Sequence, residues 1–193
     1  EEAVANMEAY RPDGEDPYRW NWVTPIEMSP HNPQVLYTGA HVVLRSLDRG
    51  ETWQEISPDL TANDERCGIN SGYVPYCTIT SISESPAEAG VFWVGTDDGK
   101  VWLSRYGGGE WVELTRQVAE AGGPADRYVS RVFASPHDPA TAFITKNGFR
   151  NDDFQPWLLR TADFGQSWER IDAGLPDSPI NVVVQDRENA NLL

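Results

Sequence analysis

One eight-residue pattern occurs three times in this chain, and its spacing limits what the chain can fold into. It reads SLDRGETW at 46–53, SRYGGGEW at 104–111 and TADFGQSW at 161–168. The closing Trp therefore recurs after 58 residues (111 − 53) and then after 57 (168 − 111). Self-similarity at a fixed period is typical of a repeat architecture, in which each copy is one structural unit.

A second pattern advances in step with the first. MSPHNPQVLYTG begins at Met28, ESPAEAGVFWVG at Glu84 and ASPHDPATAFIT at Ala134. A degenerate fourth copy, QDRENANLL, begins at Gln185. Two independent patterns in the same order favour three complete units and the start of a fourth.

Short runs rich in β-branched and aromatic residues, bounded by Gly or Pro, indicate strands within each unit. These runs are 35–37, 41–45, 91–94, 101–103, 128–133 and 180–184. Only 113–123 carries a helix signal, for a turn or two. Four short strands in a unit of roughly 40–50 residues form the blade of a β-propeller. We therefore predict an all-β chain of four-stranded antiparallel blades at 18–58, 77–116 and 128–172, a partial blade at 179–193, an inserted loop at 59–76 and a polar arm at 1–17.

Each eight-residue pattern is expected to be a turn held by its own side chains. Gly50 and Gly165 allow a residue with φ > 0 without strain. Asp48 and Asp163 are placed to accept hydrogen bonds from N–H groups of the same turn. The second copy has Tyr106 in the Asp position, followed by three glycines. Backbone freedom is expected to replace the carboxylate there.

The pattern S-x-D-x-G-x-T-W resembles the Asp-box (BNR-type repeat) of sialidases, sortilin-type receptors, xyloglucanases and photosystem II assembly-factor propellers. YRWNWVTPI, GTDDG and FRNDDFQPW are similar to stretches of exported bacterial sortilin-like propeller proteins. The box residues are Ser46, Asp48, Gly50, Thr52, Trp53, Ser104, Gly108, Trp111, Thr161, Asp163, Gly165, Ser167 and Trp168. The resemblance implies that the boxes are structural, joining the third and fourth strands on the rim opposite the ligand face.

The ligand face is then expected at the loops that join the second and third strands of each unit. The candidate binding residues in these loops and in the inserted loop are His41, Tyr73, Asp97, Asp98, Asn147, Arg150, Asp152 and Asp153. Glycoside hydrolysis needs two carboxylates across a cleft, and Asp97, Asp98, Asp152 and Asp153 are the candidates. Adjacent Asp pairs are also good turn and cap residues, and we favour that interpretation.

The net charge of −15 argues against nucleic acid and anionic membrane surfaces as partners. A protein partner that is basic, or a calcium ion, would suit this charge, and a glycan remains an alternative ligand. The acidic stretch at 151–153 lacks the spacing of an EF-hand loop. No metal site or other cofactor is expected, because the three His residues have no ligand spacing. No apolar run approaches the ~18–20 residues of a membrane helix.

Cys67 and Cys77 lie ten positions apart (77 − 67) in the loop after the first unit. In an exported protein such a pair is expected to form a disulfide that ties the loop; two buried free thiols are the alternative. The resemblance implies export to the periplasm or the cell exterior. The opening EEAVANMEAY is not a signal peptide, so we expect one to have been removed or to lie upstream.

Three units and part of a fourth fall short of the usual ~4–8 blades of a closed propeller. We expect the chain to be part of a larger propeller, or two copies to complete one ring. The predicted function is a non-catalytic exported scaffold that engages a protein partner, or the remaining blades, through its inter-strand loops. The alternative is a xyloglucanase-like or sialidase-like glycoside hydrolase that uses the loop carboxylates.

Overall fold

The computed structural model describes residues 9, 11, 14–67 and 76–193. Three four-stranded antiparallel sheets, here called blades, follow one another along the chain. Blade one contains β1 (Ile26–Met28), β2 (Leu36–Gly39), β3 (Val43–Ser46) and β4 (Gln54–Glu55). Blade two contains β5 (Ile79–Glu84), β6 (Phe92–Thr96), β7 (Val101–Ser104) and β8 (Val112–Glu113). Blade three contains β9 (Tyr128–Ala134), β10 (Ala142–Gly148), β11 (Asp153–Thr161) and β12 (Glu169–Arg170).

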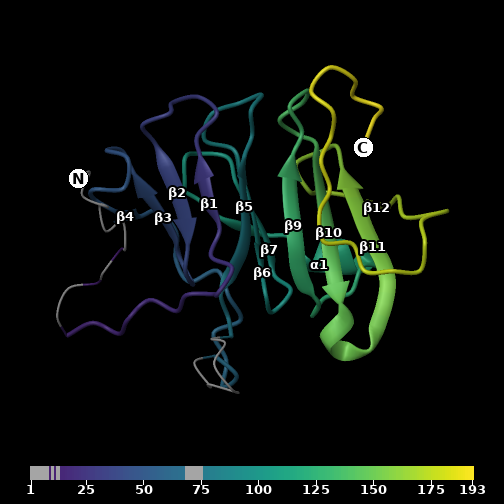
Figure 1. Ribbon diagram of the computed structural model, residues 1–193, viewed down its shortest axis with the longest axis horizontal. Helices are drawn as coiled ribbons and strands as arrows, with labels where there is room; N and C mark the ends of the chain where they lie inside the picture. Colours follow the sequence, from purple (N-terminus) through teal and green to yellow (C-terminus); the bar gives the residue numbers. More distant parts are fainter. Residues whose placement is uncertain (1–8, 10, 12–13, 68–75) are drawn as a thin grey trace, which may run out of the picture.

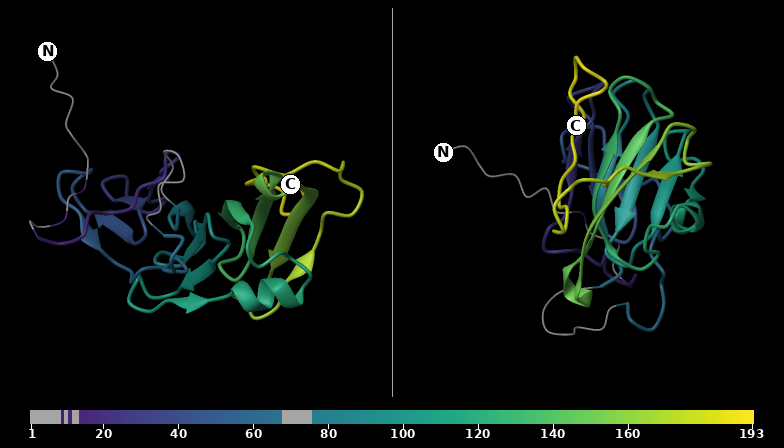
Figure 2. Two further views of the ribbon diagram at one scale, coloured as in Figure 1. Left: turned by 90° about the horizontal axis from the view of Figure 1, so that it is seen from below. Right: turned by 90° about the vertical axis from the view of Figure 1, so that its right-hand side faces the viewer.

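Within every blade the strands pair in sequence order, which confirms the predicted all-β architecture. The helical content is small: α1 (Thr115–Glu120) lies where the sequence predicted one or two turns, and η1 (Phe149–Asn151) connects β10 to β11. Figures 1 and 2 show the blades side by side in chain order along an open arc. The hairpin connections 40–42, 97–100 and 149–152 share one end of the arc, the lower end in Figure 1. The eight-residue turns lie at the upper end.

Side-chain hydroxyls bridge the first strands of neighbouring blades. The Ser81 Oγ on β5 accepts a hydrogen bond from the N–H of Val132 on β9 (3.0 Å). Two residues on, the Ser83 Oγ accepts one from the N–H of Ala134 (3.1 Å). Alternate residues of a strand point to the same side, so Ser81 and Ser83 both satisfy backbone donors of the next blade.

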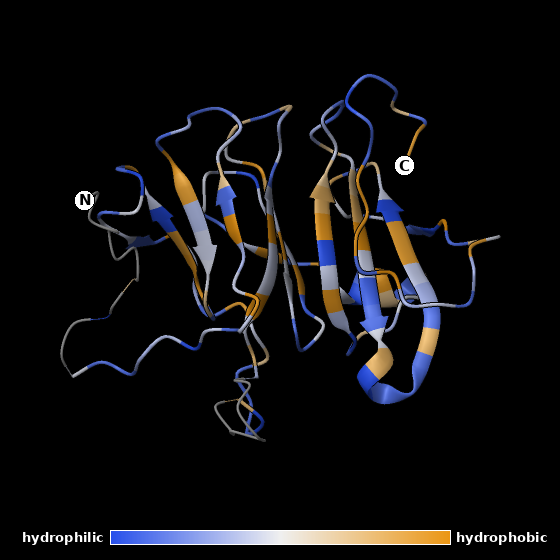
Figure 3. Cartoon of the chain, in the orientation of Figure 1, coloured by the Kyte–Doolittle hydropathy of each residue, from blue (hydrophilic) through white to orange (hydrophobic). Residues whose placement is uncertain are grey.

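The core consists of apolar layers between the blades. Between blades two and three, the buried Trp93 ring meets the Trp168 ring edge-on, with centroids 6.0 Å apart. Between blades one and two, Tyr37 and Phe92 make a similar contact at 4.8 Å. Figure 3 shows apolar and polar bands along β9, as expected for a strand whose two faces have different neighbours.

The eight-residue turns contain the hydrogen bonds that their sequence predicted. In the first turn, Asp48 accepts bonds from the Thr52 N–H (2.9 Å) and hydroxyl (2.6 Å) and from the Ser46 hydroxyl (2.7 Å). These bonds, with those from Thr52 the largest influence, lower the pKa of Asp48 to about 2. In the third turn Asp163 accepts the equivalent bonds from the Ser167 N–H (2.9 Å) and hydroxyl (2.6 Å) and from the Thr161 hydroxyl (2.9 Å).

Two consecutive residues, rather than the one that we expected, have positive φ in each turn. Arg49 and Phe164 precede the glycines at φ 62° and 57°, while Gly107 and Gly108 occupy both positions in the second turn. Two consecutive left-handed residues bend the chain sharply within a connection of seven residues, and Gly takes the second position without strain. The second turn keeps the bond from the Gly108 N–H to the Ser104 hydroxyl (3.1 Å) without any carboxylate.

The turn glycines also bring neighbouring blades into contact. A Cβ atom on Gly108 would lie 2.6 Å from the carbonyl oxygen of Ile56 in blade one. A Cβ atom on Gly165 would lie 2.3 Å from a methyl carbon of Leu114 in blade two. Ile56 and Leu114 occupy equivalent positions, since the N–H of each donates to the carbonyl oxygen of the first residue of the third strand, Val43 or Val101. Each later turn therefore both closes its own hairpin and packs on the preceding blade.

Asp163→Ala should lower the free energy of unfolding by about 1 kcal/mol, because the Ser167 N–H and two hydroxyls lose their acceptor at a largely solvated turn. Urea denaturation measures the change. The control is Asp152→Asn, which removes an exposed negative charge but keeps a residue that tolerates the left-handed conformation at this position, and it should leave stability nearly unchanged. An equal effect of the two substitutions would contradict this account.

In the fourth, partial copy of the repeat, the turn at 185–193 is formed but the strand predicted before it is not. The Asp186 N–H bonds the Leu192 carbonyl (2.9 Å), as the Ser29 N–H bonds the Val35 carbonyl in the first copy (3.0 Å). The strand predicted at 180–184 is wrong: this segment is extended, with Ile180 accepting a bond from the Ser130 hydroxyl (2.7 Å). It is not a strand because no backbone ladder pairs with it in the described part of the chain.

Candidate functional site

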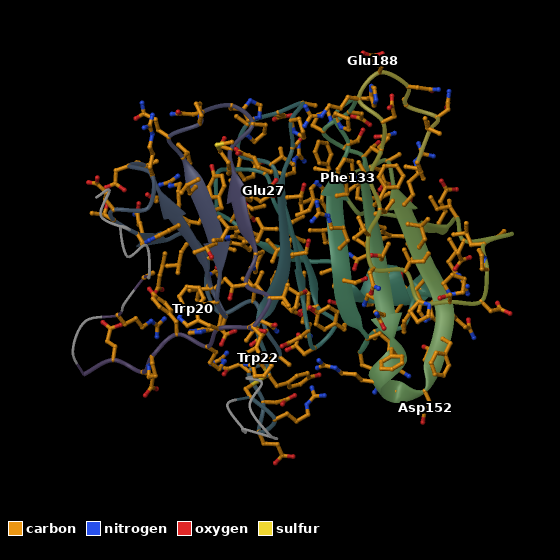
Figure 4. All side chains as sticks on the ribbon, in the orientation of Figure 1. Trp20, Trp22, Glu27, Phe133, Asp152 and Glu188 are labelled. Atoms are coloured by element: carbon orange, nitrogen blue, oxygen red, sulfur yellow. A yellow bond between two sulfur atoms is a disulfide. The ribbon has the colours of Figure 1, made fainter. Side chains whose placement is uncertain are left out.

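A cavity of about 510 Å³ opens at the lower end of the arc, where hairpins of blades two and three meet the chain that precedes blade one. Its walls combine aromatic rings with carboxylates, amides and guanidinium groups. The lining residues are Asn21, Trp22, Val23, Arg66, Tyr76, Asp97, Asp126, Tyr128, Asn147, Phe149, Arg150 and Asn151. Figure 4 shows Trp22 and Asp152 toward this end and Glu188 at the opposite end.

The segment before blade one is fixed to blade two through Asn21. The Asn21 amide donates to the Thr78 hydroxyl (2.8 Å), and its carbonyl oxygen accepts from the Val23 N–H (3.0 Å). The backbone carbonyl of Asn21 accepts a bond from the Thr24 hydroxyl (2.6 Å). This tight turn places Trp22 at the cavity with 72% of its surface exposed. An exposed Trp held by a rigid turn is well suited to contact a ligand.

Asp97 lies in the cavity wall and is only 7% exposed. It accepts bonds from the Thr78 N–H (2.9 Å) and hydroxyl (2.6 Å), both neutral groups. Burial raises the pKa of Asp97 to about 6, with a smaller contribution from the adjoining Asp98, although the Thr78 bonds act in the other direction. A carboxyl group that titrates near neutral pH in a cavity is a common property of functional sites.

Asp98 and Asp153 were predicted to bind a ligand, but the structure gives them internal partners outside the cavity lining. Asp98 is 5% exposed and accepts bonds from the Ala62 N–H (2.6 Å) and the Thr96 hydroxyl. Asp153 accepts a bond from the Trp157 ring N–H (3.0 Å) and pairs with Arg127 (N···O 3.3 Å). These carboxylates hold the inserted loop and the β10–β11 hairpin in place.

His41, also predicted as a binding residue, is buried and lies outside the cavity lining. Its Nδ1 accepts a hydrogen bond from the Arg19 N–H (3.2 Å), so the proton of the neutral ring is on Nε2. Burial, reinforced by the Arg19 charge, lowers the pKa of His41 to about 4. The ring therefore anchors the N-terminal segment.

The inserted loop contributes Arg66 and Tyr76, which flank the disulfide. The predicted Cys67–Cys77 bridge is confirmed, with Cα atoms 5.1 Å apart. The Arg66 guanidinium lies over the Tyr76 ring at 5.4 Å and donates to both carboxylate oxygens of Asp64. Tyr73, predicted in the same loop, lies outside the described residues.

The β10–β11 hairpin provides the far wall of the cavity. The Asn147 amide donates to the Asn181 side chain (2.6 Å), and its oxygen accepts from the Phe149 N–H (2.8 Å), which starts η1. Arg150 is exposed in η1 and lines the cavity. Asp152 ends η1 in a left-handed conformation (φ 54°) and does not line the cavity.

Three of the eight predicted binding residues, Asp97, Asn147 and Arg150, therefore meet in one cavity. Sequence reasoning missed Asn21, Trp22, Asp126, Tyr128 and Phe149, among others. Trp20 packs against the cluster of Val42 and Leu44, whereas Trp22, two residues later, is exposed at the cavity.

Among the described residues, one group could supply three metal ligands: Asp64, Cys67 and Cys77. Both sulfurs are engaged in the disulfide, so this group is not a metal site. Within the described part of the chain, no helix has the length and apolar character needed to cross a membrane.

The sequence matches no protein-family model and no curated protein sequence. Solved structures do match. An ancestral GH74 enzyme is similar over 84% of this chain and 19% of its own length, with a TM-score of 0.58 and 15% identity. The GH74 xyloglucanase from Xanthomonas campestris is similar over 77% and 23%, with a TM-score of 0.50 and 20% identity.

A third similar structure is YCF48 bound to D1 peptide, over 88% of this chain and 47% of that one, with a TM-score of 0.49 and 16% identity. The chain thus spans about a fifth of the two GH74 enzymes. Together with the three four-stranded sheets, these GH74 similarities settle the architecture. The fold is that of β-propeller blades. At such low identity the similarity extends to the fold and no further.

Proposed function

We propose that this chain is a non-catalytic binding scaffold that engages a segment of a partner protein at the cavity between its lower hairpins. The observation that carries the proposal is the cavity itself, to which distant parts of the chain contribute aromatic side chains, two of them highly exposed. Trp22 and Phe149 both line the cavity and are 72% and 64% exposed. Exposed aromatic residues around a preformed hollow are typical of protein-binding hot spots.

The surrounding structure supports binding by shape. Asn21 and Asn147 are both fixed by hydrogen bonds to other segments, so the walls are organised before a ligand arrives. Pre-organised side chains lose less conformational entropy on binding. The disulfide agrees with the proposed export, because such bonds persist in oxidising compartments.

A displayed library of random peptides, selected on the wild-type protein, tests the proposal. Selected peptides should bind Trp22→Ala and Phe149→Ala less tightly by about 1–2 kcal/mol, since each substitution removes a contact in the cavity. The matched control is Tyr106→Ala, which removes an aromatic ring that is 68% exposed in the upper turn at 104–111. Selected peptides that bind the wild-type protein and all three variants equally would show that the cavity is not the binding site.

Glycoside hydrolysis is the second candidate function, favoured by the presence of Asp97 and Asp126 in one cavity and by the raised pKa of Asp97. The test is incubation with xyloglucan, β-glucans and sialosides. Our proposal predicts no turnover. Hydrolysis that Asp97→Asn abolishes, while substrate binding persists, would establish the enzyme instead.

A further inference from the structure

The aromatic rings and carboxylates of the cavity are a combination that suits a cation. Trp22, Tyr76, Tyr128 and Phe149 present rings to the same hollow, and Asp97 and Asp126 add carboxylates. The face of an aromatic ring carries negative charge and attracts guanidinium and ammonium groups. The attraction is stronger where water is partly excluded, as at the wall that contains Asp97.

The charged side chains that line the cavity are not equally available to pair with a ligand. Arg66 is neutralised by Asp64, whose carboxylate accepts from its Nε at 3.0 Å and from its Nη2 at 2.6 Å. Asp126 is paired with Arg127 (2.7 Å) and is exposed. Among the described residues that line the cavity, Asp97 and Arg150 are therefore the charged groups without a paired opposite charge.

These two charges differ in environment. Arg150 is exposed at the rim, where solvent and salt screen it. Asp97 is enclosed in the wall and its hydrogen-bond partners Thr78 and Asn21 are neutral. A buried carboxylate without a cationic partner gains most from a cation supplied by a ligand. The net charge of −15 attracts such a ligand from a distance.

We propose that the cavity receives an arginine or lysine side chain from a basic segment of the partner protein, with aromatic rings around it and Asp97 as its counter-ion. This inference rests on the proposed function and adds the chemical class of the ligand.

Binding should then depend on pH. The charged and titratable groups that surround Asp97 are Asp98 on its own hairpin, Arg66 and Tyr76 from the inserted loop, Asp126 and Tyr128 before and in β9, and Arg150 in η1. Burial raises the pKa of both tyrosines, so they stay protonated below pH 8. A bound cation favours ionised Asp97, so affinity should rise as the pH rises through about 6, by up to about tenfold between pH 5 and 7.5.

The probes are three short acetylated and amidated Gly/Ser peptides that differ only in a central pair of Arg, Gln or Glu residues. Calorimetric or NMR titration should show that the Arg peptide binds the wild-type protein several-fold more tightly than the other two. Asp97→Asn should weaken binding of the Arg peptide several-fold and remove its dependence on pH. Arg150→Ala should leave that binding unchanged or strengthen it, since a like charge is removed.

Asp152→Asn is the matched control, because it removes a carboxylate from the same end of the molecule but outside the cavity lining, and Asn tolerates the left-handed conformation. It should leave binding of the Arg peptide unchanged. Tighter binding of the Glu peptide, equal binding of all three, or loss of binding in Arg150→Ala would overturn the inference. Pocket-dependent peptides from the display experiment that lack Arg and Lys would overturn it too, while leaving the proposed function in place.

Discussion

Trp93→Ala is expected to lower the free energy of unfolding by about 3–5 kcal/mol, the range measured when large aromatic side chains are removed from tightly packed cores. Trp93 is fully buried on β6 and its ring packs edge-on against Trp168 of the next blade. Its indole N–H has no hydrogen-bond partner among the residues that the structure describes, so the expected loss reflects packing. The substitution empties the layer that joins blades two and three.

Urea denaturation of the two proteins measures this effect. Trp22→Ala is the matched control, because it deletes the same side chain from an exposed position and should change stability by about 0.5 kcal/mol or less. If Trp93→Ala does not fold, Trp93→Phe retains a ring and should give a smaller loss. A loss below about 1 kcal/mol for Trp93→Ala would mean that the blades are not held together by this layer.

The second large effect concerns Lys146, whose contribution to stability should depend strongly on pH. Lys146 is completely buried on β10, and its Nζ donates to the carbonyl oxygens of Gly99 (2.8 Å) and Pro124 (2.7 Å). Burial lowers the pKa of Lys146 from 10.5 to about 7. The folded protein therefore holds fewer protons than the unfolded chain between these two values.

Stability must then rise with pH in this window, by about 1.4 kcal/mol per pH unit for one group. Relative to the protein with protonated Lys146, this gain in stability is complete above pH 10.5 and is lost as the pH falls toward 7. Lys146→Met removes the titrating group. The wild-type protein should accordingly gain about 3 kcal/mol relative to this variant between pH 7.5 and 9.5. If the difference in unfolding free energy between the two proteins does not change with pH, burial does not lower the pKa of Lys146 in the folded protein.

Local features of the structure could be predicted from the sequence because short-range spacing determines them. The Ser-x-Asp-x-Gly spacing places Ser46, Asp48 and Gly50 within hydrogen-bond distance of one another in a single turn. The Cys67–Cys77 bridge and α1 were predicted for the same reason, since their partners lie close in the sequence. The repeat period then gave the number of complete blades.

The cavity depended on contacts that no local pattern contains. Asp97 and Asp98 are adjacent and chemically identical, yet one faces the cavity and the other bonds Ala62 in the inserted loop. His41 is enclosed because the N-terminal segment returns across it, a contact between residues 22 positions apart. Trp22 and Phe149 meet the same hollow only because the blades are arranged along an arc.

The contacts between blades recur at the upper end of the molecule. The His31 Nε2 donates to the carbonyl oxygen of Ser85 (2.8 Å), and the His137 Nε2 does the same to Asp186 (2.8 Å). The lower hairpins differ in length and structure from blade to blade, from 40–42 to the η1-containing connection at 149–152. The connection at 97–100 is tied to its surroundings, because the Gly99 carbonyl accepts a bond from Lys146 and the Asp98 carboxylate accepts one from Ala62. The free energy of closing a loop grows only slowly with its length, about 0.6 kcal/mol for each doubling, so the exposed connection at 149–152 can change in length and sequence, and with it the binding specificity, while the arrangement of the blades stays the same.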